Sequence, residues 1–193
     1  MTTVSWLGDA EAKPAPGALR RVQALINTVD RESGQDRLAE AADAGPWLAA
    51  NGLLGVGETL TRRDLDVVIA VREALRALVM HNAGGPPPDD AATAVLRTLA
   101  DDGVVRVCVD GSSVSLTTDR ISMRARLLAL LLVIRDAQLD GTWGHLKTCA
   151  NEACLWVFFD RSRNHGGTWC DMSTCGNKLK NRDFRARQRR STP

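Results

Sequence analysis

Near the C-terminus the sequence reads Cys149-Ala-Asn-Glu-Ala-Cys154 and, after fifteen further residues, Cys170-Asp-Met-Ser-Thr-Cys175. A tetrahedral structural zinc site takes its ligands in such pairs, because each pair reaches the metal from one short turn and the chain between them folds back. The sequence therefore predicts that Cys149, Cys154, Cys170 and Cys175 hold a structural Zn²⁺ ion. Four unrelated buried thiols and a disulfide pair are the alternatives.

The residues between and after these cysteines predict a small module. We expect a knuckle at 149–154, a strand at 155–160, a polar and basic turn at 161–167, a returning strand at 168–170, and a helix whose first turn contains Cys175. Knuckle, hairpin and helix in this order describe a treble-clef-like zinc finger. Its few large apolar side chains make a core too small to fold alone, so the metal would supply much of the folding free energy.

The chain before this module is predicted to be mainly helical. Apolar residues at helical spacing, with capping and breaking residues between them, predict helices near 19–29, 37–50, 61–81, 89–100 and 119–139. A β-branched run at 104–109, the pair Asp110-Gly111 and a second run at 114–117 predict a β-hairpin, in which we expect Cys108 to pack as a small apolar residue. The predicted fold is α+β: a helical and hairpin domain over residues 1–142, then the zinc finger over 143–193.

Charge divides the chain in the same way. From His145 onward there are ten basic and four acidic residues, a net charge of +6, whereas the preceding 144 residues carry −4. A basic module attached to an acidic body is typical of a protein whose one end meets a polyanion. A solvated basic tail is the other interpretation.

No segment predicts export or membrane insertion. Residues 1–13 contain acidic residues and lack the basic start and long apolar run of a secretory signal. The longest apolar run, Leu127 to Ile134, is far shorter than the roughly 20 residues that span a bilayer. We therefore expect a cytoplasmic protein with no membrane partner, and a reducing compartment favours thiolate metal ligands over disulfides.

Two segments resemble known families. The run Leu146-Lys147-x-Cys149-Ala-Asn-x-x-Cys154-x-Trp156-Val157-Phe158-Phe159-Asp160-x-Ser162-x-Asn164, followed by Trp169-Cys170, Met172 and Cys175-Gly176-Asn177, resembles the CGNR zinc finger. Upstream, Asn27-Thr28, Trp47-Leu48 and Arg72-x-Ala74-Leu75-Arg76 are similar to the ABATE domain that precedes this finger in bacterial proteins regarded as stress-induced transcription regulators. Lys178 stands where the family has Arg, which removes the planar two-pronged donor of that position.

The resemblance implies DNA binding by the finger and a regulatory body. The residues expected at DNA are Arg161, Arg163, Lys178, Lys180, Arg182, Arg185 and Arg189. About six phosphate contacts would make the affinity fall roughly as the fifth power of salt concentration. The body is expected to sense a small-molecule effector or to form a homodimer. Asn27, Arg72 and Arg76 are the candidate ligand-binding residues, although ion pairs with Glu32, Glu58 or Glu73 would equally explain the two arginines.

Two other classes of function differ from this expectation. A zinc-stabilised module that binds protein or RNA, without sequence-specific DNA binding, is the first alternative. An enzyme is not expected, because four cysteines close the coordination shell that a catalytic zinc keeps open, and the sequence has no evident nucleophile and base pair.

Overall fold

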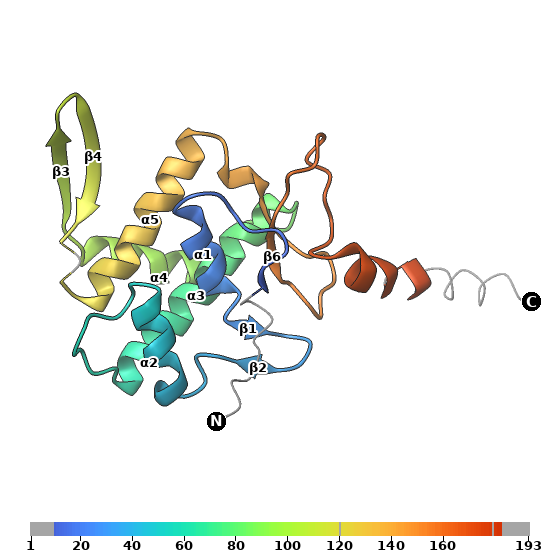
Figure 1. Ribbon diagram of the computed structural model, residues 1–193, viewed down its shortest axis with the longest axis horizontal. Helices are drawn as coiled ribbons and strands as arrows, with labels where there is room; N and C mark the ends of the chain where they lie inside the picture. The colour runs from blue at the N-terminus through green and yellow to red at the C-terminus, as the bar shows by residue number, and fades with distance from the viewer. Residues whose placement is uncertain (1–9, 120, 179, 183–193) are drawn as a thin grey trace, which may run out of the picture.

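The structure is a computed structural model that describes residues 10–119, 121–178 and 180–182 (Figure 1). The helices are α1 (Leu19–Ile26), α2 (Ala41–Ala50), α3 (Arg62–Asn82), α4 (Asp90–Asp101) and α5 (Met123–Leu139), with a 3₁₀ turn η2 (Trp143–His145) and a π-helical turn η3 (Met172–Gly176). Three antiparallel pairs of strands lie within the described residues: β1 (Val29–Asp30) with β2 (Gln35–Asp36), β3 (Val105–Asp110) with β4 (Ser113–Thr118), and β5 (Leu146–Thr148) with β6 (Val157–Phe159). The α+β prediction is confirmed.

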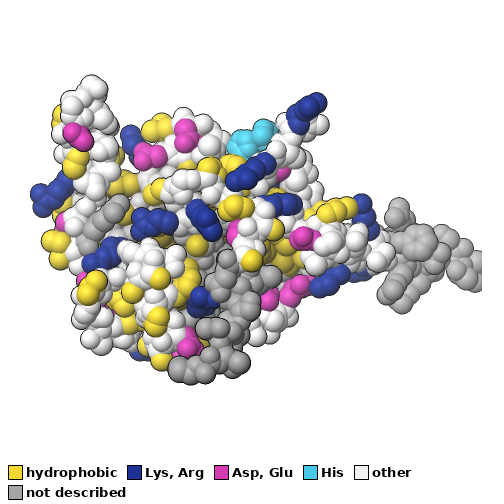
Figure 2. Space-filling model, viewed as in Figure 1, with side chains coloured by type: hydrophobic (Ala, Val, Ile, Leu, Met, Phe, Trp, Pro, Cys, Tyr) yellow, Lys and Arg dark blue, Asp and Glu magenta, His cyan; other side chains and the backbone are white. Residues whose placement is uncertain are grey.

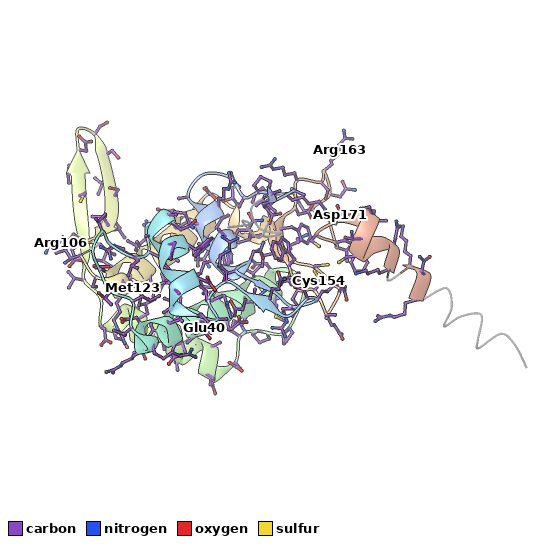
Figure 3. All side chains as sticks on the ribbon, turned by 60° about the horizontal axis from the view of Figure 1, so that its bottom comes forward. Glu40, Arg106, Met123, Cys154, Arg163 and Asp171 are labelled. Carbon is purple, nitrogen blue, oxygen red and sulfur yellow. The ribbon has the colours of Figure 1, made fainter. Side chains whose placement is uncertain are left out.

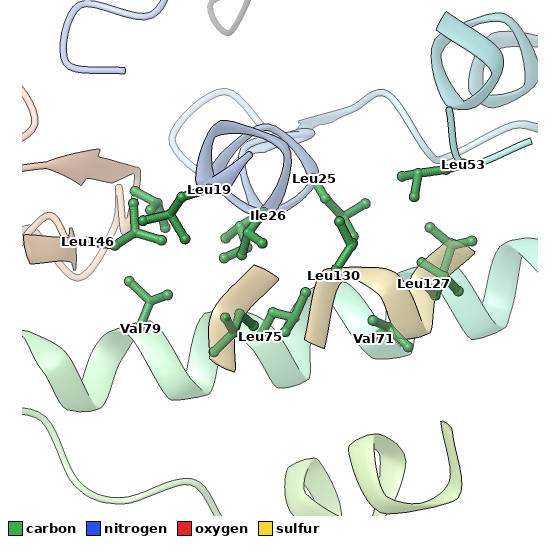
Figure 4. Packing of buried hydrophobic residues seen from close by; sticks show 14 of the residues in the cluster. Leu19, Leu25, Ile26, Leu53, Val71, Leu75, Val79, Leu127, Leu130 and Leu146 are labelled. Carbon is green, nitrogen blue, oxygen red and sulfur yellow. The ribbon is translucent and has the colours of Figure 1, made fainter. Parts of the chain in front are cut away.

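The main core lies between α1, α3 and α5 (Figure 4). Leu25 and Ile26 of α1 are fully buried, as are Leu75 of α3 and Leu130 of α5. Leu146 of β5 is also fully buried in this cluster, so the start of the cysteine-containing segment shares the core of the helical body. Among the residues the structure places, no helix combines the length and the apolar character needed to cross a membrane.

Capping residues fix where the long helices begin. Thr61 precedes α3, and its Oγ1 accepts a hydrogen bond from the N–H of Asp64 at 3.2 Å, while the Asp64 carboxylate accepts from the Thr61 N–H at 3.1 Å. This reciprocal box satisfies two N–H groups that a helix N-terminus leaves unpaired. Ser122 caps α5 in a similar way, through the N–H of Ala125. The predicted start near Thr61 is confirmed.

The predicted hairpin is present, but its environment differs from the expectation. Asp110 pairs with Ser113 across a two-residue turn, in which Gly111 has a φ of 56°. Every residue of β3 is exposed, and Cys108 is exposed with them. The prediction that Cys108 packs as a core residue is wrong, because the hairpin projects from the end of the molecule opposite the cysteine cluster (Figure 1).

Two further expectations are corrected by strand pairing. The first helix ends at Ile26 rather than near Val29, because Val29–Asp30 pairs with Gln35–Asp36, and α2 therefore begins only at Ala41. In the finger, β6 pairs with β5, with Leu146 opposite Phe159, and residues 168–170 form no strand. The prediction of a returning strand at 168–170 is thus wrong. The hairpin of the finger is formed by β5 and β6, and the first knuckle lies in the turn between them.

Candidate metal centre

The first two cysteines lie in the turn that joins β5 to β6. Cys149 follows β5 directly, and its N–H donates to the carbonyl O of Trp156 at 2.8 Å. Within the turn, the N–H groups of Cys154 and Leu155 donate to the carbonyl O of Asn151 at 2.8 and 3.0 Å. Leu155 has a φ of 49°, in the left-handed region, which reverses the chain toward β6. This knuckle holds the two thiols close together.

The second pair comes from the loop after β6 and from η3. The N–H of Ala150 donates to the carbonyl O of Thr168 at 3.0 Å, which holds this loop against the first knuckle. Asp171 caps η3 through a backbone N–H at 2.9 Å, and Cys175 lies within η3. Helical backbone continues after η3 through the described residues up to 182. The predicted position of Cys175 in the first helical turn is therefore confirmed.

Close packing around η3 accounts for the glycine that follows Cys175. A Cβ at Gly176 would come within 2.5 Å of the Sδ atom of Met172 and 3.2 Å of the Trp169 ring, so a larger residue would displace η3. Asn177 is exposed and donates to the carbonyl O of Ser173 at 3.2 Å. The asparagine that reaches a sulfur is Asn151, whose Nδ2 lies 3.6 Å from the Sγ of Cys175.

The four sulfur atoms have the spacing of a tetrahedral metal site. All lie within 4.8 Å of one another, and the Sγ of Cys170 is 3.8 Å from those of both Cys154 and Cys175. Four sulfurs at the usual Zn–S distance of about 2.3 Å stand about 3.8 Å apart, whereas a disulfide needs about 2.05 Å. All four cysteines are free. The structure thus brings the predicted ligands together as a group that can hold a metal ion.

The chemistry of the sulfurs also suits a cation. Hydrogen bonds from the thiols of Cys154 and Cys170 lower the pKa of Cys149 to about 2. The same contact with Cys149 raises the pKa of Cys154 to about 12, and contacts with both Cys149 and Cys154 raise the pKa of Cys170 further. Thiols this close cannot all ionise without a cation, because neighbouring thiolates repel one another, so some of them keep their protons. A divalent cation bound among them would let all four thiols ionise, would compensate two of their four negative charges and would act as a cross-link.

Side chains from α1, from its C-cap Asn27 and from α3 hold β6 in place. Asn27 accepts a hydrogen bond from the N–H of Val157 at 2.8 Å and donates to the carbonyl O of the same residue at 2.8 Å. Gln23 also donates to that carbonyl, at 3.1 Å. From α3, Arg76 donates to the carbonyl O of Leu155 at 3.1 Å and to an α1 carbonyl at 2.7 Å. Buried amides and a guanidinium therefore attach the metal-binding turn to the body.

The three candidate ligand residues do not form one site. Arg72 makes a two-pronged ion pair with Asp36 at 2.7 and 2.9 Å and, like Arg76, contacts Glu73, which is one of the ion-pair partners considered from the sequence. Asn27 alone of the three lines a cavity of about 360 Å³. The polar and aromatic lining of this cavity includes Glu11, Arg20, Gln23, Asn27, Arg37 and Trp47.

A buried carboxylate organises the loop between the two cysteine pairs. Asp160 accepts hydrogen bonds from the N–H groups of Ser162 and Gly167, at 3.0 and 2.7 Å, and forms an ion pair with Lys147 at 2.9 Å. Burial raises the pKa of Asp160, but these hydrogen bonds outweigh burial and hold its pKa below the ordinary value. A Cβ at Gly167 would lie 2.6 Å from the carboxylate, so this approach requires glycine.

The described basic candidates lie on two projections at the cysteine end (Figures 1 and 3). Arg163 is exposed on the loop between the cysteine pairs, and Lys180 and Arg182 are exposed on the final helical segment. Arg161 donates to the carbonyl O of Pro14 at 2.8 Å, and Lys178 pairs with Glu32 at 3.0 Å. Arg185 and Arg189 lie outside the described residues. In the view of Figure 2, basic side chains are visible on the loop and along this helix.

Four residues support the cysteine group without having been expected there from the sequence, and one of them, Glu32, had been considered only as an ion-pair partner of Arg72 or Arg76. Asn151 and Lys147 flank Cys149 and contact Cys175 and Asp160, respectively. Glu32, from the β1–β2 turn, accepts hydrogen bonds from Lys178 and from Asn151, the latter at 3.3 Å. Glu32 is remote in sequence, and nothing in the pattern could have placed it here. Lys147 and Asp160 both lie in the run that resembles the CGNR zinc finger, and this was the one available signal for that pair.

The histidines lie apart from the sulfur group. His145 stacks on Phe159, with ring centroids 5.7 Å apart, and His165 meets the edge of His145 at 3.9 Å. His81 contacts the carbonyl O of Gly85 through Nδ1. Within the described residues, the potential metal ligands that gather are the four cysteines alone.

Comparison with known proteins agrees with this geometry. Residues 145–188 match the CGNR zinc finger, and residues 19–139 match ABATE, described as "Putative stress-induced transcription regulator". No curated protein matched the chain. The two matches follow each other in the order expected from the sequence, and the second covers more than half of the 193 residues. The chain therefore belongs to the ABATE family and carries a C-terminal CGNR zinc finger.

Proposed function

We propose that this protein is a zinc-dependent transcription regulator that binds DNA through its finger. The observation that carries the proposal is the group of four sulfurs at tetrahedral spacing, from which a basic loop and a basic helix extend. Zn²⁺ held by Cys149, Cys154, Cys170 and Cys175 would be structural, because four thiolates complete its shell. A catalytic role for the metal is not part of the proposal.

The DNA surface consists of side chains that the metal site positions. Arg163 projects from the loop between the cysteine pairs, while Lys180 and Arg182 follow the second pair on the helix. Arg185 and Arg189 extend the same basic sequence. Lys and Arg side chains of this kind neutralise phosphates and release counterions, which gives strong but salt-sensitive binding. We assign these residues to phosphate contact, which positions a protein on DNA without reading the sequence.

The body is assigned the regulatory part of the function. The cavity lined by Gln23, Asn27 and Trp47 is the place that we propose for a small-molecule effector. The lining contains two basic residues, Arg20 and Arg37, and one acidic residue, Glu11, and this excess of positive charge favours a ligand with an anionic group. Thermal-shift measurement with panels of small anionic metabolites tests this assignment, with a Trp47→Ala variant as the control. Binding that survives Trp47→Ala unchanged would place the ligand elsewhere.

Salt-dependent binding to duplex DNA is the central experiment. The zinc-loaded chain should bind labelled duplex with an affinity that falls steeply between 50 and 200 mM salt. The triple variant Arg163→Ala, Lys180→Ala, Arg182→Ala should bind more weakly across all sequences and should lower the slope of log affinity against log salt by about 3. A control variant removes two basic residues of the body, Arg97 and Arg135, which are exposed on α4 and α5, and should leave the slope unchanged.

The same experiment separates the alternatives. Absence of any salt-sensitive duplex binding by the zinc-loaded protein would reject the DNA proposal. Binding to single-stranded or structured RNA with no duplex binding would favour the RNA-interaction module instead. A location in the cytoplasm at the nucleoid follows from the proposal, and a chromatin-occupancy map would test it and supply the target sites together.

A further inference from the structure

The β3–β4 hairpin has one covered edge and one open edge. β4 contacts α5, whereas β3 lies on the side away from the body and contacts β4 (Figure 1). All six residues of β3 are exposed. A two-stranded hairpin alone is marginally stable in water, and an open edge presents unpaired N–H and C=O groups to any strand that fits.

The two faces of β3 differ in chemistry. Val105, Val107 and Val109 lie on one face, where they neighbour Val114 and Leu116 of β4. Val107 and Val109 are 66% and 72% exposed, which leaves this apolar face uncovered by the described chain. Arg106, Cys108 and Asp110 lie on the other face. Among the described residues, neither Arg106 nor Asp110 has an ion-pair partner.

The register of the hairpin determines which backbone groups face outward. Asp110 and Ser113 flank the two-residue turn and form a hydrogen-bonded pair. Because hydrogen-bonded and non-hydrogen-bonded pairs alternate, Cys108 and Arg106 also bond to β4. The N–H and C=O groups of Val105, Val107 and Val109 therefore point to the open edge.

This edge is complementary to itself. When two β3 strands run antiparallel with Cys108 opposite Cys108, Val107 of each faces Val109 of the other, and their outward groups can exchange hydrogen bonds. Arg106 then lies opposite Asp110 twice, once on each side of the two-fold axis. A register centred on Val107 keeps the hydrogen bonds but places Arg106 opposite Cys108 and forms no charge pair. Opposite charges directly across a sheet stabilise the pairing, so the register centred on Cys108 is favoured.

We propose that β3 pairs with β3 of a second copy of this chain to form a continuous four-stranded antiparallel sheet, with Cys108 beside the two-fold axis. Such an isologous contact is closed and carries the apolar faces of both hairpins on one side. Six residues per strand bury less than the roughly 1,200 Å² of a stable interface, so the dimer is in exchange with monomer at micromolar concentrations. The inference rests on the hairpin and does not require metal or DNA binding.

A charge-reversal experiment on the full chain tests the register. Arg106→Asp places Asp opposite Asp110 of the second copy twice, and Asp110→Arg places Arg opposite Arg106 twice. Each variant should self-associate on the order of tenfold more weakly than wild type in sedimentation equilibrium. An equimolar mixture of the two variants restores both opposite-charge pairs, so it should form a heterodimer about as tight as the wild-type dimer. This rescue shows that both variants are folded.

Cross-linking provides the second readout. Under mild oxidation the zinc-loaded protein should form a disulfide dimer through Cys108, since facing residues of a non-hydrogen-bonded pair stand close enough for a disulfide. Cys108→Ser should abolish the dimer, and Cys108→Ser with Val109→Cys should not restore it, because residue 109 faces residue 107. A wild-type protein that stays monomeric at several hundred micromolar would overturn the proposal. The proposal would also be overturned if the mixture of the two variants dimerised no more tightly than either variant alone. The same holds if Val107→Lys abolished the dimer while neither charge reversal weakened it.

Discussion

Asn27 joins the helical body to the metal-binding turn, and its replacement by alanine tests that connection. Its side chain accepts a hydrogen bond from the Val157 N–H and donates one to the Val157 carbonyl, both at 2.8 Å. Only 3% of the residue is exposed. In Asn27→Ala the Val157 N–H would lose this acceptor in a buried place, which costs about 1–3 kcal/mol. The Val157 carbonyl keeps its hydrogen bond from Gln23 at 3.1 Å, so losing the hydrogen bond from Asn27 to this carbonyl adds only about 1 kcal/mol.

We therefore expect Asn27→Ala to lower the free energy of unfolding by about 2–4 kcal/mol. With an m-value of about 2 kcal/mol/M, the urea midpoint should fall by about 1–2 M. The assay is urea unfolding followed by far-UV circular dichroism, with zinc content measured on the same samples. The zinc content should stay near one per chain in native buffer, because all four ligands remain.

Asn177→Ala is the matched control for this experiment. Asn177 is exposed and donates to the carbonyl O of Ser173, so its replacement should change stability by no more than about 0.5 kcal/mol. Asn27→Asp gives a further comparison, because it retains the acceptor for the Val157 N–H but sets a carboxylate against the carbonyl. It should destabilise at least as much as alanine at neutral pH. A loss below about 0.5 kcal/mol in Asn27→Ala would refute the assigned role of these bonds.

Three other substitutions have defined outcomes. Cys175→Ser should abolish tight zinc binding and lower the midpoint temperature of a single unfolding transition of the whole chain, because strand β6 packs in the core of the body. Calorimetry measures this midpoint, and an unchanged transition of the body would argue against the coupling. Glu32→Gln releases Lys178 from its ion pair and should tighten duplex binding a few-fold while raising the salt slope by up to about 0.9, as fluorescence anisotropy would record; unaltered affinity would separate Lys178 from the DNA surface. Asp160→Asn leaves the largely buried Lys147 without its carboxylate and should cost about 3 kcal/mol near pH 7. Since the pKa of Asp160 is lowered in the folded state from 3.8, its contribution is present above that pH and declines as the pH falls below it, so the two chains should converge in acid denaturation series.

Local patterns predicted the parts of this fold that depend on local chemistry. Paired cysteine spacing predicted the sulfur group, the Thr61 and Asp64 pair predicted the start of α3, and Asp110-Gly111 predicted the turn of the hairpin. Each of these signals arises from residues within a few positions of one another. Sequence alone was therefore sufficient for the presence of the five helices, the hairpin and the candidate ligands, but not for the end of α1 or the start of α2.

What the sequence did not predict depends on distant partners. β5 and β6 have three residues each, too short for an alternating pattern, so their pairing around the knuckle was missed and a strand at 168–170 was predicted instead. The β-branched residues of β3 suggested burial for Cys108, but strand propensity does not say whether a face is covered. Glu32 reaches the finger from 119 positions before Asn151, a contact that only the folded chain reveals.

Gln23 and Asn27 both line the cavity of the body, and both donate a hydrogen bond to the carbonyl O of Val157 in β6. A molecule that entered this cavity and reoriented these two amides would change their hydrogen bonds to Val157 of β6, three residues after Cys154. By thermodynamic reciprocity, a cavity ligand that changed the affinity of the finger for its own ligand would have its own affinity changed by the same factor. Gln23 on α1 and Asn27 at its C-cap thus connect the cavity of the body to the turn that carries the first two candidate metal ligands.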